Sequence, residues 1–390
     1  MTPAARTQAA IELLDAVIDA ARGGGAAADT LIARYFATRR YAGSKDRRAV
    51  RDLVYAAIRR AGDVPASGRA AMLAVAAEAG DIAATFDGSV HGPAPITPEE
   101  PAAAGGVMPA WLADALAGSG VTPAQQAALI DRAPLDVRVN RLLADPSEIA
   151  ATLGGEPIPG LPDALRLPTG THVDPHAGRI EVQDAGSQIV SLAAYAKAGE
   201  RIVDLCAGGG GKTLALAAAM ANDGHILATD IDRGRLSRLT PRAEKAGVTI
   251  VETRLLDPKR EVAALADWAE SADTVLIDAP CSGTGTWRRN PEARWRLTPE
   301  RLARFAEQQR HVLDVGAGLV RRGGALVYIV CSLLDAEGAG QVDAFLADHP
   351  DWHAEPLRLP AGTPRGGGLR LDPASHGTDG FFVARLIRAC

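Results

Sequence analysis

Two of the four cysteines in this 390-residue chain occupy matching places, each just after an apolar run. Cys281 follows "TVLIDAP" and Cys331 follows "ALVYIV", and both runs have the composition of buried β-strands. A thiol that lies where a strand ends and a loop begins can act on a bound ligand as a nucleophile. For Cys206 and Cys390 we expect the ordinary role of a small buried hydrophobe. No CxxC motif and no Cys/His spacing typical of zinc is present, so we predict no metal site.

Pyrimidine chemistry gives two such thiols a use. Addition of a thiolate to C6 of cytosine converts C5 into an enamine carbon, which can attack an electrophilic methyl group. A base must then remove the C5 proton before the sulfur can leave, and a nearby carboxyl group can stabilise the adduct through N3. The segments "DAPCSG" and "VCSL" supply these groups as Asp278, Cys281 and Cys331.

A glycine-rich loop, "DLCAGGGGKT", lies between a strand-like run and a helical run. It is not a nucleotide P-loop, because Cys206 stands where that motif requires its first glycine. Glycines at such a turn let backbone N–H groups approach a ligand closely, and Asp230 follows the next strand-like run about 20 residues later, where a carboxylate can bind ribose hydroxyls. The candidate cofactor-binding loop comprises Cys206, Ala207, Gly208, Gly209, Gly210, Gly211 and Lys212.

The elements that must position these residues form an alternating pattern. From about residue 181 to 390, strand-like runs alternate with alanine-rich helical runs, which is typical of an α/β domain with a parallel sheet covered on both faces. Ligands of such sheets bind at the carboxyl ends of the strands. Asp257 and Asp278 also follow strand-like runs, so we expect the acids and both thiols to gather at one edge.

Three further segments precede this domain. Residues 1–85 show helical periodicity throughout, residues 86–107 are rich in Pro, Gly and Ala and have the composition of a linker, and residues 108–180 mix helical runs with short strands. We therefore predict a helical domain, a linker and a small α+β subdomain before the α/β domain.

The positive charge is concentrated, although the formal net charge is −5. Residues 34–60 contain nine basic side chains against two acidic ones, and residues 288–310 contain seven arginines against three glutamates. A solvated helix face is the ordinary explanation for one such cluster, but two clusters favour phosphate contacts. "WRRNPEARWR" adds two tryptophans that either stack on RNA bases or belong to a core. The candidate RNA-binding residues are Arg47, Arg48, Arg288 and Arg289.

No uninterrupted apolar run is long enough to span a membrane, and the first residues lack the apolar centre of a secretory signal. We therefore expect a cytoplasmic monomer without a membrane partner.

Several of these motifs occur together in one known family. "VQDAGSQ", "DLCAGGGGKT", "DAPCSGTGTWRRNPEARW", "YIVCSL" and "HGTDGFFVARL" resemble the bacterial RsmB-like (Sun/Fmu, NOL/NOP/Sun) RNA cytosine-5 methyltransferases. "PLDVRVN" is similar to part of the RNA-contacting subdomain of that family, and the N-terminal segment is similar to its NusB-like helical module. The resemblance implies a Rossmann-like class I methyltransferase domain with a mostly parallel seven-stranded sheet, preceded by an RRM-like α+β subdomain and an all-helical NusB-like domain.

The resemblance also implies a role for each site residue. Cys331 would attack C6 and Cys281 would assist release of the methylated product. The loop from Cys206 to Lys212 would bind S-adenosylmethionine, with Asp230 on the ribose, Asp257 near the adenine, and Asp278 close to both cofactor and target base.

Two departures from the family pattern are visible. Gly208 and Gly209 replace Ala and Pro, which implies a more flexible loop and weaker cofactor binding. Val330 replaces the threonine before the nucleophile, which removes a hydroxyl group but no catalytic group.

Alternative functions remain. A DNA cytosine-5 methyltransferase would use only the Pro-Cys thiol, and a non-catalytic assembly factor would be expected to have lost a thiol or an acid. Ribosomal RNA is favoured as the substrate by the resemblance, and transfer RNA stays open.

Overall fold

The computed structural model describes all residues from 1 to 390 and consists of two compact units. The helical unit comprises Met1–Arg132 and Thr286–Thr298, and the α/β unit comprises Ala133–Gly285 and Pro299–Cys390. The chain therefore passes between the units three times, and the compact units do not coincide with the four predicted segments. No helix is both long enough and apolar enough to cross a membrane.

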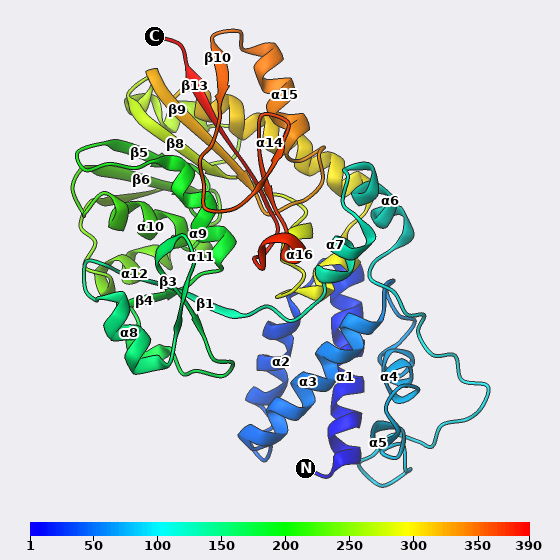
Figure 1. Cartoon of the computed structure of the whole chain (residues 1–390). Helices are drawn as coiled ribbons and strands as arrows, with labels where there is room; N and C mark the ends of the chain where they lie inside the picture. The colour runs from blue at the N-terminus through cyan, green and yellow to red at the C-terminus, as the bar shows by residue number, and fades with distance from the viewer. The chain divides into compact units, whose positions relative to one another are not determined.

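The helical unit confirms the predicted helical N-terminus. Its first helix begins after Thr2, whose side chain accepts a hydrogen bond from the backbone N–H of Ala5 (3.2 Å), and it ends at Gly24, which has φ 71°. Buried aliphatic side chains of α1, α3 and α4 form the core, and Figure 1 shows these helices packed side by side. The elements are α1 (Pro3–Gly23), α2 (Ala28–Ala37), α3 (Ser44–Arg60), α4 (Gly68–Ala76), α5 (Gly80–Ala83), α6 (Ala110–Gly118), α7 (Pro123–Ala128) and the 3₁₀ helix η5 (Pro291–Arg296).

The segment predicted as a linker, residues 86–107, forms no helix or named strand but is attached to the helical unit. The guanidinium of Arg69 pairs with Glu100 at 2.8 Å and donates to the carbonyl of Ala94 at 3.1 Å. The backbone N–H of Ala103 donates to the carbonyl of Ala70 at 2.9 Å. These contacts make the segment a part of the unit rather than a free connection.

A four-stranded antiparallel sheet begins the α/β unit, with strand order β2-β3-β1-β4. It supplies the β part of the predicted small subdomain, whereas helices α6 and α7 belong to the helical unit. The elements are β1 (Leu135–Val139), α8 (Pro146–Leu153), β2 (Glu156–Ile158), β3 (Leu161–Leu167), the 3₁₀ helix η1 (Asp174–His176) and β4 (Ile180–Val182).

The large sheet confirms the α/β class but has nine strands rather than the predicted seven. Five neighbouring strands run parallel in the order β7-β6-β5-β8-β9, and the antiparallel strands β13, β12, β11 and β10 extend the β9 side. The strands are β5 (Arg201–Asp204), β6 (His225–Asp230), β7 (Val251–Leu255), β8 (Ala272–Asp278), β9 (Val320–Val330), β10 (Trp352–Glu355), β11 (Thr363–Arg365), β12 (Gly368–Leu371) and β13 (Phe381–Arg388).

Helices cover both faces of this sheet (Figure 1). Because successive side chains of a strand point to opposite faces, neighbouring residues pack in two different cores. Ile202 packs with α9, α10 and α12, whereas its neighbour Val203 packs in the other core, to which α14 and α15 contribute. The helices are α9 (Ala185–Ser191), η2 (Leu192–Ala194), α10 (Gly211–Ala219), α11 (Arg233–Leu236), α12 (Leu239–Lys245), α13 (Glu261–Ala264), η3 (Ala266–Trp268), η4 (Thr284–Thr286), α14 (Pro299–Ala317), α15 (Ala339–Asp348) and α16 (Pro373–His376).

Candidate active site

The two thiols lie in contact, with 3.3 Å between the Sγ atoms of Cys281 and Cys331. Strands β8 and β9 are parallel neighbours, and the pairing continues past the end of β8 through a hydrogen bond from Ala279 N to Ile329 O (2.9 Å). The N–H of Gly285 then donates to the carbonyl of Cys331 at 3.0 Å. The prediction that both thiols meet at one edge of the sheet is therefore confirmed.

The hydrogen bond with Cys331 and burial raise the pKa of Cys281 well above its usual value. Cys281 is therefore a neutral thiol at pH 7 while Cys331 is unmodified. Cys206 is partly buried and packs against the core that contains residues of α14, and burial raises its pKa. Cys390 is exposed, so the prediction that it is a buried hydrophobe is wrong.

A lysine–carboxylate pair lies at the same edge, with 2.6 Å between Nζ of Lys212 and Oδ2 of Asp278. Burial alone would lower the pKa of Lys212, but the charge and hydrogen bond of Asp278 outweigh it, and Cys331 acts in the same direction. Lys212 is therefore a cation close enough to attract a thiolate on Cys331.

The glycine loop connects β5 to α10 through backbone conformations that favour glycine. Gly208 has φ 56° and Gly210 has φ 86°, and a Cβ atom at Gly210 would come within 2.1 Å of the Leu239 side chain. Asp230 holds this loop, because its carboxylate accepts from the backbone N–H groups of Gly208 (2.8 Å) and Asp232 (2.7 Å).

The two glycines that depart from the family pattern have a structural consequence. Gly208 has φ 56°, in the left-handed region that glycine adopts without the steric cost of a Cβ atom. The guanidinium of Arg235 lies 2.6 Å from the place where a Cβ at Gly208 would be. That the loop is more flexible and binds the cofactor more weakly stays a prediction.

Asp204 is the last residue of β5, just before the glycine loop, and it is completely buried. Its Oδ2 accepts from the hydroxyl of Thr213 at 2.6 Å, and its Oδ1 has no hydrogen-bond partner. Burial raises the pKa of Asp204 to about 7, and the hydrogen bond from Thr213 acts in the opposite direction. This residue therefore titrates near neutral pH.

Asp257 follows β7 and is exposed. Since β5, β6, β7 and β8 are parallel, the acids that follow or end them share one edge of the sheet, as predicted. A glycine turn with carboxylates at the ends of the adjacent strands fits a cofactor that carries a ribose and a base.

The structure contradicts one of the two interpretations of the segment "WRRNPEARWR". Trp287 and Trp295 are buried, so the prediction that they stack on RNA is wrong and the core interpretation is correct. The indole of Trp295 donates to the carbonyl of Ala61 at 3.2 Å, and the guanidinium of Arg294 donates to the carbonyls of Ile58 (2.6 Å) and Ala61 (2.7 Å). The sequence shows charge and aromatic residues but not that they fill one core.

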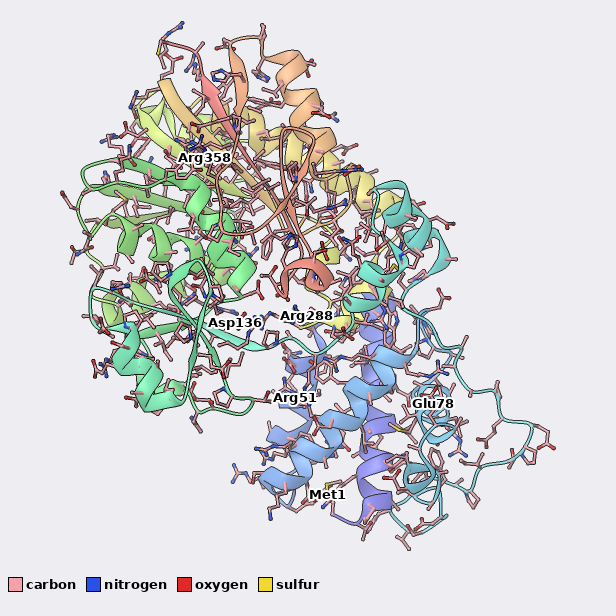
Figure 2. The ribbon with its side chains drawn as sticks, in the orientation of Figure 1. Met1, Arg51, Glu78, Asp136, Arg288 and Arg358 are labelled. Atoms are coloured by element: carbon pink, nitrogen blue, oxygen red, sulfur yellow. The ribbon has the colours of Figure 1, made fainter.

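The predicted RNA-binding arginines differ in exposure. Arg288 is 7% exposed and does not lie on an open surface, whereas Arg289 is partly exposed. Arg47 and Arg48 on α3 are exposed, and Arg47 donates to the carbonyl of Ala42 at 2.9 Å. Arg51, labelled in Figure 2, pairs with Asp29 at 2.9 Å.

The polar side chains of "PLDVRVN" form hydrogen bonds inside the α/β unit. Asp136 on β1 (Figure 2) is buried and accepts two hydrogen bonds from Arg166 (2.8 and 3.0 Å). Arg138 donates to Gln183 at 2.9 Å, and Asn140 donates to the carbonyl of Ala246 at 2.8 Å. They attach the small sheet to the rest of the unit.

Two features of the site were not predicted from the sequence. Gly285 and Gly380 approach so closely that a Cβ at Gly285 would lie 2.0 Å from the Gly380 carbonyl oxygen. Buried Glu337 receives hydrogen bonds from both cysteine loops. The signals available in the sequence were the glycine of "HGTDGFF" and an acid six residues after Cys331, but neither shows its partner.

Comparison with known proteins gives a consistent result. The family model described as 16S rRNA methyltransferase RsmB/F matches residues 192–387. The probable ribosomal RNA small subunit methyltransferase B of Synechocystis sp. is 38% identical over 275 residues, which are 65% of this chain and 60% of that protein. The ribosomal RNA small subunit methyltransferase B of Thermus thermophilus is 37% identical over 282 residues, which are 72% of this chain and 65% of that protein. This chain thus spans less than two thirds of the length of these relatives.

Two solved structures share the fold. The crystal structure of PH0851 superposes with a TM-score of 0.77 at 24% identity and covers 100% of this chain and 99% of that one. The methyltransferase homolog protein from Pyrococcus horikoshii superposes with a TM-score of 0.60 at 26% identity and covers 73% of this chain and 100% of that one.

Proposed function

Because the chain belongs to the RsmB/F family of 16S rRNA methyltransferases, we propose that it transfers a methyl group from S-adenosylmethionine to C5 of a cytosine in small-subunit ribosomal RNA. The single observation that carries this proposal is the contact between the thiols of Cys281 and Cys331, 3.3 Å apart. Packing alone gives no reason for two thiols to meet beside the Lys212–Asp278 pair.

Cys331 is the nucleophile of the proposed reaction. Its thiolate adds to C6 of the cytosine. The carboxyl group of Asp278 faces the base and stabilises the adduct at N3. When the adduct collapses, the C6–S bond breaks and Cys331 regains its thiolate.

Cys281 is the base that removes the C5 proton. In the free protein its hydrogen bond with Cys331 and its burial keep it protonated. Once Cys331 is bonded to C6 it carries no thiolate charge, so the interactions with Cys331 that raise the pKa of Cys281 are lost. Cys281 can then release its own proton to water, and the resulting thiolate accepts the proton from C5.

The cofactor is proposed to bind on the loop from Cys206 to Lys212, with Asp230 on the ribose and Asp257 near the adenine. When bound there, S-adenosylmethionine supplies the electrophilic methyl group. Asp230 keeps acceptor capacity beyond its two backbone hydrogen bonds, because each carboxylate oxygen has two lone pairs.

The exposed arginines Arg47 and Arg48, with Arg289, are proposed to contact RNA phosphates. The target cytosine must leave its stack for C5 and C6 to be reached. Transfer RNA is an alternative substrate.

The test is covalent trapping. The Cys281→Ala variant, incubated with undermethylated small-subunit RNA and S-adenosylmethionine, should accumulate a protein–RNA adduct that survives denaturing electrophoresis, because the C5 proton is no longer removed. The Cys331→Ala variant and the double variant should form no adduct, since no bond to C6 can form.

An adduct in Cys331→Ala, with none in Cys281→Ala, would exchange the two roles, as a DNA-type mechanism requires. Methyl transfer that persists in Cys331→Ala would remove the proposed mechanism. Transfer to transfer RNA alone would change the proposed substrate and leave the mechanism intact.

A further inference from the structure

Glu337 forms a buried hydrogen-bonding centre between the two cysteine loops, and the proposed reaction does not use it. Its side chain is 1% exposed, and Oε1 accepts from the backbone N–H of Ser282 (2.8 Å) and the amide of Gln309 (3.2 Å). Oε2 accepts from the hydroxyls of Ser332 (2.5 Å) and Ser282. No lysine or arginine in the chain forms an ion pair with it, so these four donors alone offset the cost of burying the carboxylate.

The donors come from both sides of the thiol contact. Ser282 directly follows Cys281 and Ser332 directly follows Cys331, so one carboxylate binds the residue next to each thiol. Gln309 on α14 extends this arrangement, because the same amide donates to the carbonyl of Pro280, the residue before Cys281 (2.9 Å).

Glu337 is itself fixed from two directions. The hydroxyl of Tyr328 on β9 donates to its backbone carbonyl at 2.6 Å, and its backbone N–H donates to the carbonyl of Leu334 at 3.1 Å. The carboxylate therefore has a defined position relative to β9, and the loop of Cys281 is held to that position.

We propose that Glu337 is a positioning residue whose buried carboxylate joins the Cys281 and Cys331 loops and keeps the two sulfurs in contact, an inference that rests on the proposed function. Without this acceptor, the loop after β8 loses its direct hydrogen bonds to Glu337 and the distance between the thiols is no longer fixed.

The negative charge of Glu337 has a second effect. The charged and titratable groups that face Cys281 are Cys331, Glu337 and Tyr328. After the hydrogen bond with Cys331 and burial, the charges of Cys331 and Glu337 also raise the pKa of Cys281. Glu337 thus favours the protonated form of Cys281.

The decisive variant is Glu337→Gln, which keeps the size of the side chain but loses the charge and one acceptor oxygen. Each carboxylate oxygen of Glu337 accepts from two donors, so in the variant two of the four donors face the NH₂ group of the glutamine instead of an acceptor. We expect kcat for methyl transfer to fall at least about tenfold, while the dissociation constant of S-adenosylmethionine stays within about twofold. Iodoacetamide alkylation of Cys281, followed by peptide mass spectrometry, should reach its half-maximal rate at a lower pH than in the wild type.

The serine variants test the connection between the loops. Ser282→Ala and Ser332→Ala each remove one donor, and their effects on kcat should be much smaller in the Glu337→Gln background than alone, since the shared acceptor is already lost. Ser191→Ala is the matched control: Ser191 is a buried serine on α9 whose hydroxyl donates to Ser187 and not to Glu337. It should leave kcat and the alkylation profile unchanged.

The outcomes separate this inference from the proposed function. An unchanged kcat and alkylation profile in Glu337→Gln overturns the positioning role, and so does a loss of kcat that only parallels a loss of cofactor affinity. If that variant does not fold, a kcat defect in Ser332→Ala with normal cofactor affinity supports the role and normal kcat overturns it. If the wild type methylates no RNA, the proposed function fails, whereas the alkylation profile still reports whether Glu337 controls Cys281.

Discussion

At the scale of single residues, Cys281 and Cys331 differ in their neighbours although their local sequences are alike. Cys331 packs against the core that contains α9 and α10 and lies near the cation of Lys212. Cys281 packs against the core that contains α14 and lies near the anion of Glu337. The two thiols therefore differ in the charge of their neighbour, a cation near Cys331 and an anion near Cys281.

The first residue-scale prediction concerns Lys212. In Lys212→Gln the positive charge next to Cys331 is lost, so we expect alkylation of Cys331 at pH 7 to slow by about tenfold, with a comparable fall in kcat. Peptide mass spectrometry after timed iodoacetamide treatment measures this rate. Lys245→Gln, at an exposed lysine on α12, is the control. Equal alkylation rates in Lys212→Gln and the wild type would contradict a role of Lys212 in activating the thiol.

The second residue-scale prediction concerns pH. The pKa of Asp204 in the folded protein is about 7, above that of an aspartate in an unfolded chain, about 3.9. Between these values the folded protein holds a proton that the unfolded chain has released, so stability must fall as the pH rises through this range, by up to about 1.4 kcal/mol per pH unit. Asp204→Asn should remove this dependence.

Thermal unfolding at pH 5, 6, 7 and 8 measures the effect. The melting temperature of the wild type should fall relative to that of Asp204→Asn as the pH rises. Asp348→Asn, at an exposed position of α15, should follow the wild type. Parallel profiles for Asp204→Asn and the wild type would mean that Asp204 is ionised throughout.

Single residues could be located from the sequence only where a pattern fixes the backbone around them. Cys281, Cys331 and Asp278 were found because strand-like runs end beside them, and parallel strands end at one edge. Trp287 and Trp295 were assigned on composition, which does not distinguish an exposed aromatic residue from a buried one. Glu337 could not be recognised, because its donors are distant in the sequence, at Ser282 and Gln309.

At the scale of elements, the site depends on how three chain segments meet beyond the sheet. The loop after β8 donates from Gly285 N to the carbonyl of Cys331 (3.0 Å), and the segment before β13 donates from Gly380 N to the carbonyl of Gly285 (2.8 Å). Strand β13 is the antiparallel neighbour of β9, so "HGTDGFF" reaches the loop that follows Cys281 although it lies some fifty residues after Cys331. The longer strands of the sheet could be predicted from the sequence. Strands β11 and β12, which form a hairpin, are too short to show a periodic pattern.

The element-scale prediction uses the contact between these two glycines. Gly285→Ala places a methyl group 2.0 Å from the carbonyl oxygen of Gly380, a backbone atom that cannot rotate away. The loop must shift, so we expect a loss of stability of about 1–3 kcal/mol and a kcat at least about tenfold lower. Gly318→Ala is the control, because its new Cβ would meet its nearest neighbour at an ordinary 3.5 Å. Normal kcat in Gly285→Ala would show that the approach of the two segments does not matter to the reaction.

At the scale of the whole molecule, the chain passes from one unit to the other after Arg132, Gly285 and Thr298, and none of these points lies in residues 86–107, the segment predicted as a linker. Thr286–Thr298 leaves the α/β unit directly after the loop of Cys281 and belongs to the helical unit. There, Glu292 accepts from the backbone N–H of Ala28 (3.0 Å), and Arg294 is completely buried with its guanidinium on backbone carbonyls. The sequence gives no signal for this insertion, because composition indicates where a loop lies but not whether its side chains join the core of another segment.

The insertion leads to a prediction for a truncated protein that begins at Ala133. Such a protein retains Trp295 and Arg294 but loses Ala61 and Ile58, to which they donate. We expect the truncated protein to be less stable than the corresponding part of the full chain, with red-shifted tryptophan emission and a tendency to aggregate, since a buried indole and a buried charge both become exposed.

Replacing both residues by serine in the truncated protein should restore solubility, whereas Trp295→Ala in the full chain should cost about 3–5 kcal/mol. Calorimetry and fluorescence on the four proteins decide this. If the truncated protein is as stable as the α/β unit in the full chain, with unchanged emission, the contacts of Arg294 and Trp295 with Ile58 and Ala61 add nothing to the stability of the α/β unit.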